Sequence, residues 1–412
     1  ILFLMHYFDL EPAAQLALYR SYDAVAQRVY GAPLPPRAER QPGRLRIGYL
    51  SGDLRNHVMG KQVWQAIRHH DRERFAIYCY ATTAGADEMT DAFRAFAHSF
   101  VSVAELNAHE AALRIAADDL DVLVDLSTHT KNAMPGILAR KPARVQITHI
   151  ASAGALGLST VDFKLTDAIC DPPENQAFLI ERLLPMQGCV YPYRHVEAAA
   201  EHPFQRSATG GAEDAILIGA FVNPLKLSRR CLDLWRQVLD AIPRARLVIS
   251  PLSREATGVY ARLFVASGIA IERVTVLPQG RNDSEGLARY SVLDFCLDPM
   301  PYGGVNGTLE ALDMEVPVVT LMGRKHSERT SASILVNLGV PQTIAQSGSE
   351  YVALCVRLAG DGAFRSEVKA AIAAGLSASP LVDMPAHARA LEAAYIEALS
   401  RTHPHVLAQA AQ

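Results

Sequence analysis

Asp298-Pro-Met-Pro-Tyr-Gly-Gly-Val-Asn-Gly-Thr-Leu-Glu-Ala-Leu312 is the most informative stretch of this 412-residue chain. The apolar run 292–297 before it predicts a buried strand, the glycines predict a tight turn, and 308–313 has the spacing of a helix start. Glycines let backbone N–H groups approach an anion, and a helix N-terminus adds unpaired N–H groups and the positive end of its dipole. The stretch predicts a phosphate-binding turn, although such turns also serve as plain strand-to-helix connections.

A second strand-to-helix junction lies upstream, where the apolar run 216–222 leads into Asn223 and Lys226. Ser228 is a predicted N-cap, because apolar residues recur after it at helical spacing, namely Leu232, Trp235, Leu239 and Ile242. A lysine beside a helix N-terminus can bind a diphosphate through the single positive charge of its ammonium group. The alternative is an ordinary surface lysine, and the glycine-rich turn favours the first interpretation.

Apolar strand candidates alternate with helical segments along the chain. They are 45–50, 75–80, 122–126, 145–150 and 163–169, then 216–222, 247–249, 274–277, 292–297 and 316–321. Strands separated by helices imply parallel sheets with right-handed crossovers. The sequence therefore predicts an α/β fold of two Rossmann-like lobes without a GxGxxG motif.

The predicted lobes are residues 37–196 and 197–385, joined near the polar stretch 197–214. A helical segment, 1–36, precedes them and ends in the proline cluster 32–37, which predicts a linker. A C-terminal helix and tail, 386–412, follow them. Ligands of open α/β sheets bind beyond the carboxyl ends of the strands, so we expect the site in a cleft between the lobes, with the last helix packing back across it.

Composition restricts the class of protein. Forty basic and 43 acidic side chains give a net charge of −3, which argues against a nucleic-acid partner. The six cysteines are scattered and lack CxxC spacing, so we expect reduced core residues in a cytoplasmic protein. The opening apolar residues are too few to span a membrane, and the missing initiator Met suggests a fragment.

Two histidines follow predicted strands of the first lobe. His57 ends the glycine-containing stretch 46–57, and His129 lies in the polar stretch 125–131. A histidine can transfer a proton near neutral pH, but it equally caps helices or bonds backbone carbonyls. The pair Asp119 and Asp121 spells a DxD pattern but precedes a strand, so it predicts a solvated turn, and no group has metal-ligand spacing.

Several ordered motifs together resemble a known family. They are Gly48-Tyr-Leu-Ser-Gly-Asp-Leu-Arg-Asn-His57, Asp125-Leu-Ser-Thr-His-Thr130, Arg140-Lys-Pro-Ala-Arg-Val-Gln146, Lys226 with Trp235, Cys296-Leu-Asp-Pro-Met-Pro-Tyr302 and Val316-Pro-Val-Val-Thr-Leu-Met-Gly323. From Arg44 onward the chain resembles the catalytic region of the O-linked N-acetylglucosamine transferases, glycosyltransferase family 41. The resemblance implies a GT-B fold, UDP-N-acetylglucosamine as donor, no metal or other cofactor, inverting transfer to Ser or Thr of proteins, and upstream tetratricopeptide helices.

The resemblance also implies roles by position. Lys226 matches the lysine that neutralises the donor diphosphate and is counted with the catalytic residues, and His57 matches the histidine proposed as general base. His129, which follows another predicted strand, is the next candidate for the base. The remaining donor contacts implied are Asn223, Pro278, Gln279, Gly280, Arg289, Gly304, Asn306, Gly307, Thr308 and Glu310. Among them, residues 278–280 match the backbone that reads uracil, and Glu310 stands where the family has an aspartate on the ribose.

The chain departs from the family pattern at Ile150-Ala-Ser-Ala-Gly-Ala155, where relatives carry Gly-Tyr-Pro-Gly-Thr. Val305 and Leu309 also stand where many members have polar or smaller residues. Loss of a positioning loop affects acceptor chemistry more than donor binding. Alternatives to a protein N-acetylglucosaminyltransferase therefore stay open: a transferase for another sugar or acceptor, or a UDP-sugar-binding sensor or scaffold of low activity.

Overall fold

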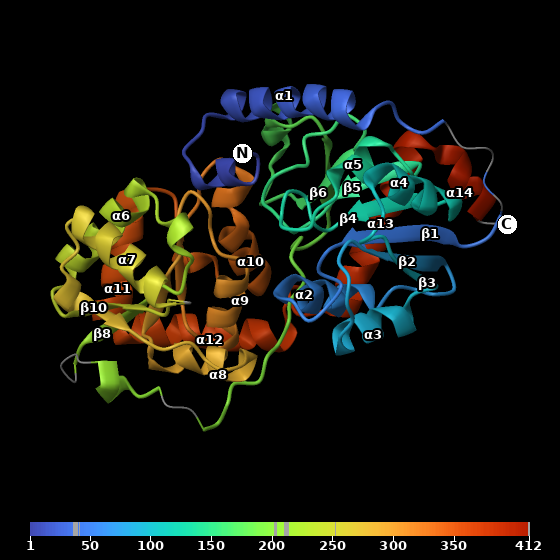
Figure 1. The fold of residues 1–412 in the computed structure, drawn as a ribbon. Coiled ribbons are helices and arrows are strands. Elements are labelled where there is room, and N and C mark those ends of the chain that lie inside the picture. Colours follow the sequence, from blue (N-terminus) through green and yellow to red (C-terminus); the bar gives the residue numbers. More distant parts are fainter. Residues whose placement is uncertain (36–39, 41, 202–203, 210–213, 252, 411–412) are drawn as a thin grey trace. The chain divides into compact units, whose positions relative to one another are not determined.

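The computed structural model describes residues 1–35, 40, 42–201, 204–209, 214–251 and 253–410 (Figure 1). They form two compact units, the first of residues 1–6, 10–193 and 383–412 and the second of 7–9 and 194–382. The segments 1–36 and 386–412, which we expected to be distinct from the lobes, are grouped with the first unit as far as they are described, except for residues 7–9. Residues 36–37 of the predicted linker, and 202–203 and 210–213 of the predicted junction, lie outside the described residues.

The first unit is built on one parallel sheet of seven strands in the order β3-β2-β1-β4-β5-β6-β7. The strands are β1 (Leu45–Ser51), β2 (Phe75–Ala81), β3 (Ser99–Ser102), β4 (Val122–Asp125), β5 (Val145–Thr148), β6 (Phe163–Asp167) and β7 (Arg182–Met186). The central strands are buried along their whole length, as expected for a sheet covered on both faces.

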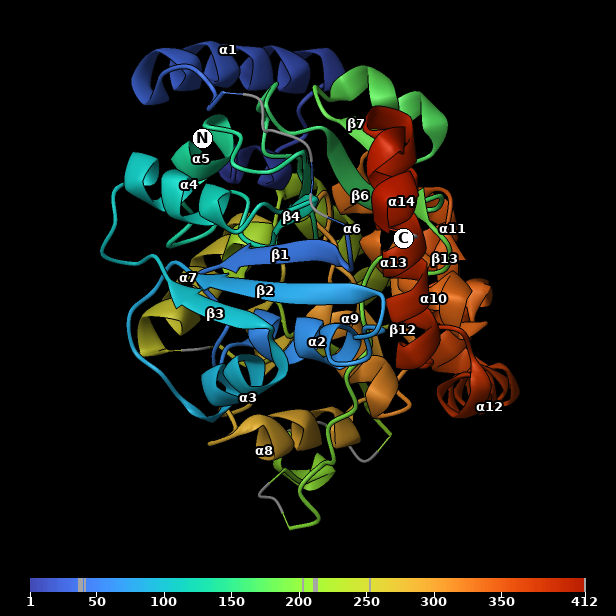
Figure 2. The ribbon, with the colours of Figure 1, turned by 90° about the vertical axis from the view of Figure 1, so that its right-hand side faces the viewer.

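Helices cover both faces of this sheet. They are α1 (Pro12–Tyr30), α2 (Val58–Ile67), α3 (Glu88–Phe96), α4 (Ala108–Ala117), α5 (Pro135–Ala139), α13 (Met384–Thr402) and α14 (Pro404–Ala410), with the 3₁₀ helices η1 (Leu4–Tyr7) and η2 (Pro173–Phe178). Figure 2 shows α4 and α5 on one face of β1–β3 and α2 and α3 on the other. Helix α1 packs on α5, and α13 packs on α2.

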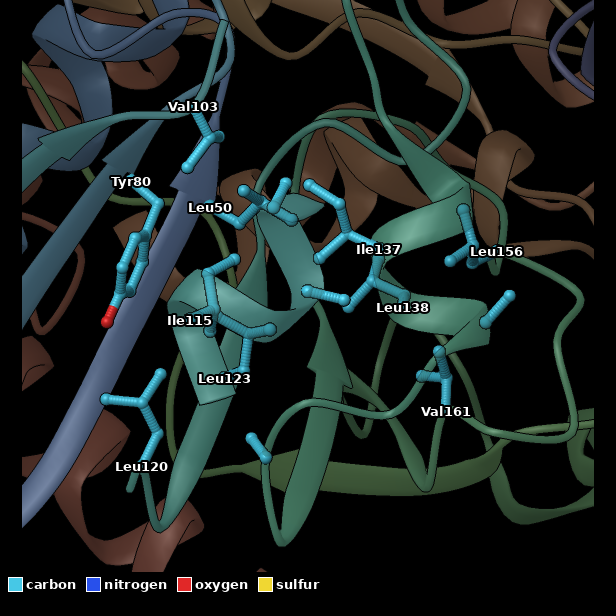
Figure 3. Packing of buried hydrophobic residues seen from close by; sticks show 14 of the residues in the cluster. Leu50, Tyr80, Val103, Ile115, Leu120, Leu123, Ile137, Leu138, Leu156 and Val161 are labelled. Carbon is cyan, nitrogen blue, oxygen red and sulfur yellow. The ribbon is translucent and has the colours of Figure 1, made fainter. Parts of the chain in front are cut away.

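The core beneath α4 and α5 is apolar and closely packed. Leu50 and Leu123 project from β1 and β4 toward Ile115 of α4 and Ile137 of α5 (Figure 3). Four such side chains, each at most 1 % exposed, contribute roughly 1.5–3 kcal/mol apiece to folding. This core fixes the sheet whose strand ends carry His57 and His129.

The second unit has a parallel sheet in the order β10-β9-β8-β11-β12-β13. Its strands are β8 (Ile216–Gly219), β9 (Ala245–Ile249), β10 (Val274–Val276), β11 (Phe295–Leu297), β12 (Val318–Leu321) and β13 (Ile344–Ala345). Its helices are α6 (Arg229–Ala241), α7 (Arg254–Ala266), α8 (Asp283–Ala288), α9 (Asn306–Asp313), α10 (Thr330–Leu338), α11 (Gly348–Gly360) and α12 (Gly362–Ala378). Short 3₁₀ helices are η3 (Arg206–Thr209), η4 (Pro224–Lys226), η5 (Ile271–Arg273), η6 (Arg289–Val292), η7 (His326–Glu328) and η8 (Pro341–Thr343). Helix α6 packs on α11, and α9 packs on α10.

The α/β prediction of two parallel sheets is confirmed, and each predicted strand is present. Several end earlier than predicted, and the run 292–297 forms a strand only from Phe295, because η6 occupies its start. Three strands were not predicted: β3, β7 and β13. The six cysteines are buried and free, as expected.

The predicted turn at Asp119 and Asp121 is confirmed, since the pair lies between α4 and β4, but the prediction that it is solvated is wrong for Asp121. Asp121 is fully buried, and its carboxylate accepts from Arg40 Nε at 2.8 and 2.9 Å and from the Arg46 backbone N–H at 2.8 Å. Arg144 lies 2.9 Å from Asp119 and 3.7 Å from Asp121. The pair forms an ion-pair network, buried at Asp121 and partly exposed at Asp119, that joins residues at the start of the first sheet.

Candidate functional site

The second sheet has a topological switch point between β8 and β11. From β8 the chain proceeds outward to β9 and β10, and it returns through β11 toward β12 on the other side. Loops after two such strands diverge and leave a crevice at their carboxyl ends, the usual ligand position in open α/β sheets. The loop after β8 carries Lys226, and the loop after β11 is the glycine-rich turn.

Lys226 reaches the glycine-rich turn. Its Nζ donates to the Gly303 carbonyl at 2.7 Å and lies 4.2 Å from the centre of the Tyr302 ring. Ser228, confirmed as the N-cap of α6, also donates to the Met300 carbonyl at 2.7 Å, so two contacts join the loops. Burial lowers the pKa of Lys226 to about 8, against the opposing charge of Asp298.

Asp298 shapes the glycine-rich turn from inside. Its Oδ1 accepts from the Gly304 backbone N–H at 2.6 Å, and its Oδ2 accepts from the Thr320 hydroxyl at 2.7 Å. A Cβ at Gly303 would lie 2.9 Å from Asp298 Oδ2, so the carboxylate occupies the space that any other side chain would need. Burial raises the pKa of Asp298, while these hydrogen bonds and Lys226 lower it.

Helix α9 begins directly after the turn. Asn306, Gly307 and Thr308 form its first turn, where backbone N–H groups have no partner inside the helix, and Val305 before them supplies no side-chain cap. The Thr308 hydroxyl is bonded to Ser331 Oγ at 2.8 Å, and Ser331 also donates to the Gly304 carbonyl at 3.0 Å. The amide groups and the positive end of the helix dipole therefore adjoin Lys226's loop and suit a phosphate group.

A second polar group lies at the carboxyl ends of β9 and β10, around Ser250. Gln279 Nε2 donates to the Ser250 carbonyl at 2.7 Å, and the Ser250 hydroxyl donates to the Pro278 carbonyl at 3.2 Å. Arg289 donates to Ser250 Oγ and lies 5.0 Å from the centre of the Phe221 ring. Gly280 packs so closely on Gly286 that an added Cβ would lie 2.2 Å from its nitrogen. The structure thus brings the residues expected around the base to one place.

Two further predicted donor residues have local partners. Glu310 accepts from the Tyr290 hydroxyl at 3.1 Å, and burial raises the pKa of its carboxyl. Asn223 is exposed and caps η4, with Oδ1 accepting from the Leu225 N–H at 2.9 Å. Asn223 comes after β8 and Glu310 comes after β11, so both positions are compatible with a donor contact.

In the first sheet the switch point lies between β1 and β4, and both predicted histidines follow these strands. His57 is the N-cap of α2: its Nδ1 accepts from the Met59 N–H at 3.3 Å, with Asp53 Oδ2 at 3.5 Å. Its side chain is 40 % exposed, so a ligand can reach the ring. The Gly52 N–H donates to Ser127 Oγ at 3.2 Å and ties the two loops together.

His129 is more enclosed than His57. Its Nε2 lies 2.7 Å from the Leu156 carbonyl, so this nitrogen carries the proton, and its ring packs edge-on to Tyr22. Burial lowers the pKa of His129. Nearby, Asp125 accepts from the Thr128 N–H at 2.8 Å and holds that β-branched residue at a φ of 47°, and burial raises the pKa of Asp125 to about 6.

Sequence reasoning missed three residues that organise the second unit's site: Asp298, Ser250 and Ser331. Asp298 was recognisable in principle, since a carboxylate ending an apolar strand faces the ligand edge of the sheet. Ser331 gave no such signal, because it comes from α10 and reaches the turn only through the fold. Within the part of the chain that the structure describes, no cluster of three or more His, Cys, Asp or Glu side chains is arranged to hold a metal ion, and no helix is long and apolar enough to cross a membrane.

Comparison with known proteins agrees with this geometry. The model of glycosyl transferase family 41 matches residues 29–202 and 204–391. The chain is 30 % identical over 357 residues to the probable UDP-N-acetylglucosamine–peptide N-acetylglucosaminyltransferase SPINDLY of Arabidopsis thaliana, covering 85 % of this chain and 39 % of that protein. A Caenorhabditis elegans UDP-N-acetylglucosamine–peptide N-acetylglucosaminyltransferase is 21 % identical, with 85 % and 40 % covered. The chain thus spans about two fifths of these curated relatives.

Among solved structures, a mutant O-GlcNAc transferase of Thermobaculum terrenum matches with a TM-score of 0.84 and 30 % identity, covering 97 % of this chain and 76 % of that one. An Anabaena protein, Alr3699/HepE, solved with UDP and glucose, has a TM-score of 0.53 at 13 % identity, with 85 % and 100 % covered, and shows likeness of fold alone. The first match confirms the GT-B architecture of two Rossmann-like sheets. Family model, sequence relatives and fold agree, and the chain belongs to glycosyltransferase family 41.

Proposed function

We propose that this chain is the catalytic region of an inverting, metal-independent glycosyltransferase that moves N-acetylglucosamine from UDP-N-acetylglucosamine to Ser or Thr of proteins. The observation that carries the proposal is the junction of Lys226 with the turn of Gly303 and Gly304 and the start of α9. A cationic side chain and uncapped backbone N–H groups at a sheet switch point suit a diphosphate. The names of the relatives support the sugar and the peptide acceptor.

In the proposed reaction the acceptor hydroxyl oxygen attacks the anomeric carbon of the sugar as the bond from that carbon to the diphosphate oxygen breaks. Lys226 and the N–H groups of Asn306 and Gly307 stabilise the charge on the departing UDP. The hydroxyl proton passes to His57, whose exposed ring is held at the start of α2. Attack opposite the leaving group inverts the anomeric carbon.

We infer that a lysine and a helix N-terminus take the place of the divalent cation that other transferases use. Both supply positive potential without a carboxylate cluster. UDP should therefore bind with equal affinity in EDTA and in Mg²⁺. We propose no further cofactor, a cytoplasmic location, and helical repeats upstream in a longer chain.

One observation favours the alternative of a UDP-sugar-binding module with little turnover, or of a transferase with a different acceptor. Segment 150–155, which departs from the family pattern, packs against the N-terminal residues. Ile150 has a φ of 69°, and the Ala155 N–H donates to the buried hydroxyl of Tyr19 at 3.0 Å. A Cβ at Gly154 would lie 2.1 Å from His6 Nε2. This loop is already packed against the N-terminal segment, which leaves it few groups for positioning an acceptor.

Calorimetry with UDP, UDP-glucose and UDP-N-acetylglucosamine, each in EDTA and in Mg²⁺, tests the proposal. We expect binding of UDP and of at least one UDP-sugar, equal in both buffers. Failure to bind any of the three would overturn the donor assignment, and a strict Mg²⁺ requirement would overturn metal independence. Radiolabelled donor incubated with lysate proteins then separates a transferase, which labels protein, from a binding module, which does not.

A further inference from the structure

A short N-terminal strap, residues Tyr7–Asp9, belongs to the second unit, although the residues before and after it belong to the first. The Tyr7 ring packs edge-to-face on Tyr302, with ring centres 5.0 Å apart. Lys325 Nζ donates to the Phe8 carbonyl at 3.1 Å, and Arg230 Nη1 lies 3.8 Å from Asp9 Oδ1. The strap therefore rests beside the glycine-rich turn, of which Tyr302 is part.

Tyr302 is also the ring on which Lys226 rests. Lys226 Nζ lies 4.2 Å from the ring centre and donates to the carbonyl of Gly303, the next residue. The face of an aromatic ring attracts a cation, and this attraction is lost when the ring turns away. The orientation of the Tyr302 ring therefore sets the position of the Lys226 ammonium group before a ligand binds.

We infer that Tyr7 is a positioning residue for the diphosphate site, which acts on Lys226 through the ring of Tyr302. The inference rests on the proposed function, because it takes Lys226 as the group that meets the diphosphate. A lysine side chain has many rotamers, and a site that holds it ready spends less binding free energy on ordering it. The edge of one ring against the face of another restricts Tyr302 to few orientations.

Two of the groups in the strap are largely exposed to solvent. Phe8 is 60 % exposed, and the side chains of Arg230 and Asp9 are each about half exposed, so their ion pair is screened by water and salt. Arg230 is shared with Glu328, whose Oε1 lies 3.6 Å away. Movement of residues 7–9 therefore changes donor affinity without requiring the second unit to unfold.

Calorimetric titration of UDP into matched variants tests the inference. Tyr7→Ala and Tyr302→Leu should each weaken UDP binding by about three- to tenfold, since Tyr302→Leu removes the ring beneath Lys226 and Tyr7→Ala leaves that ring free to turn. Tyr7→Phe keeps the ring and should stay within twofold of wild type. Phe8→Ala, which removes an exposed neighbouring ring, is the control and should have no effect.

A double-mutant cycle separates positioning from general damage. In a Lys226→Ala background, Tyr7→Ala should cause no further loss, because its effect passes through the lysine. Equal losses in both backgrounds, or a Tyr7→Ala variant that binds UDP as wild type does, would overturn the inference and leave the proposed function intact. A wild-type chain that binds no UDP would overturn both.

Discussion

At the scale of single residues, the proposed diphosphate contact depends on the charge of Lys226. A lysine carries its charge below its pKa, and burial lowers the pKa of Lys226 to about 8. UDP affinity should therefore fall as pH rises from 7 to 9, by at most about tenfold per pH unit above the pKa. Lys226→Ala should lose a charge-assisted contact of roughly 1.5–3 kcal/mol, or about tenfold or more in affinity, at pH 7.

Lys226→Arg is the matched control for this pH dependence. A guanidinium stays charged throughout the range, so its UDP affinity should be nearly constant from pH 7 to 9. Calorimetry at half-unit pH steps measures both profiles. Parallel profiles for wild type and Lys226→Arg would assign the pH dependence to UDP or to another group.

Asp298 provides a second prediction at this scale. Asp298→Asn leaves one oxygen where two now accept, so the Gly304 N–H or the Thr320 hydroxyl loses its partner inside the protein. An unsatisfied buried polar group costs about 1–3 kcal/mol, and we expect that loss in the free energy of unfolding together with weaker UDP binding. Thr320→Val removes one of the two donors and leaves the turn's bond to Asp298 in place, so it should lower stability and spare UDP affinity. Equal UDP affinities for Asp298→Asn and wild type would show that Asp298 does not contribute to UDP binding.

The sequence predicted the roles of some residues and not of others, depending on whether the interacting partner is near or far along the chain. Ser228 as a cap and Lys226 beside a helix start follow from their immediate neighbours, and the structure has them there. Asp121 was misjudged because its partner Arg40 lies outside the local pattern. No local rule reports that a carboxylate before a strand will be enclosed by an arginine from another segment.

At the scale of elements, helix α13 is joined to the first sheet through buried polar side chains. His70 bonds Glu392 of α13 at 2.9 Å and Tyr49 at 2.6 Å. His387, in the first turn of α13, is 7 % exposed, and burial, aided by nearby His149 and His70, lowers the pKa of His387 to about 3. A histidine that must stay neutral inside the protein makes this docking sensitive to acid.

The sign of the effect follows from proton binding. Between its folded pKa of about 3 and the ordinary value of 6.5, His387 binds protons mainly in the unfolded chain. Stability should therefore fall as pH drops below 6.5, by up to about 1.4 kcal/mol per pH unit from this group. Asp125 and Glu181, whose carboxyl pKa values burial raises to about 6 and 7, act in the opposite direction, so the test compares variants.

His387→Leu removes the titrating group and should gain stability relative to wild type as pH falls from 6.5 to 4.5. Urea unfolding at several pH values measures the difference between the two proteins. His109→Leu, a change of an exposed histidine on α4, is the control for removal of a histidine that lies outside this contact. A His387→Leu profile parallel to wild type would show that His387 does not titrate on unfolding.

Which strands the sequence revealed depends on their place in the sheet. Central strands such as β2 and β4 are buried along their length and give continuous apolar runs. The unpredicted strands β3, β7 and β13 all lie at sheet edges. An edge strand is short or partly exposed, and β7 even contains Pro185, so its composition resembles that of a loop.

At the scale of the whole molecule, the sequence predicted two parallel-sheet units but not which unit holds the terminal helices. Tyr19 of α1 is fully buried and bonded to Ala155, and Glu392 of α13 is bonded to His70. Each pair is far apart in sequence, and amphipathic helices look alike whether they cover one sheet or another. Assignment of these helices required the tertiary structure.

The last prediction concerns two proposed functions, donor binding and proton transfer, whose residues lie in different units. The groups proposed to hold UDP lie in the second unit, whereas His57 lies in the first. If His57 takes the acceptor proton, His57→Ala should lower transfer by about a hundred- to ten-thousand-fold and leave UDP affinity nearly unchanged. A radiolabel transfer assay and UDP calorimetry on the same preparation measure the two properties.

His57 also caps α2, so His57→Ala should lower transfer and should also destabilise the protein by about 0.5–2 kcal/mol. His57→Asn separates the two, because asparagine is a good N-cap but cannot act as a base near neutral pH. We expect both variants to lose transfer and His57→Asn alone to keep wild-type stability. Normal turnover in His57→Asn would make His57 a structural cap. The base would then have to be sought at His129, whose Nε2–H is committed to the Leu156 carbonyl and whose Nδ1 would have to receive the proton.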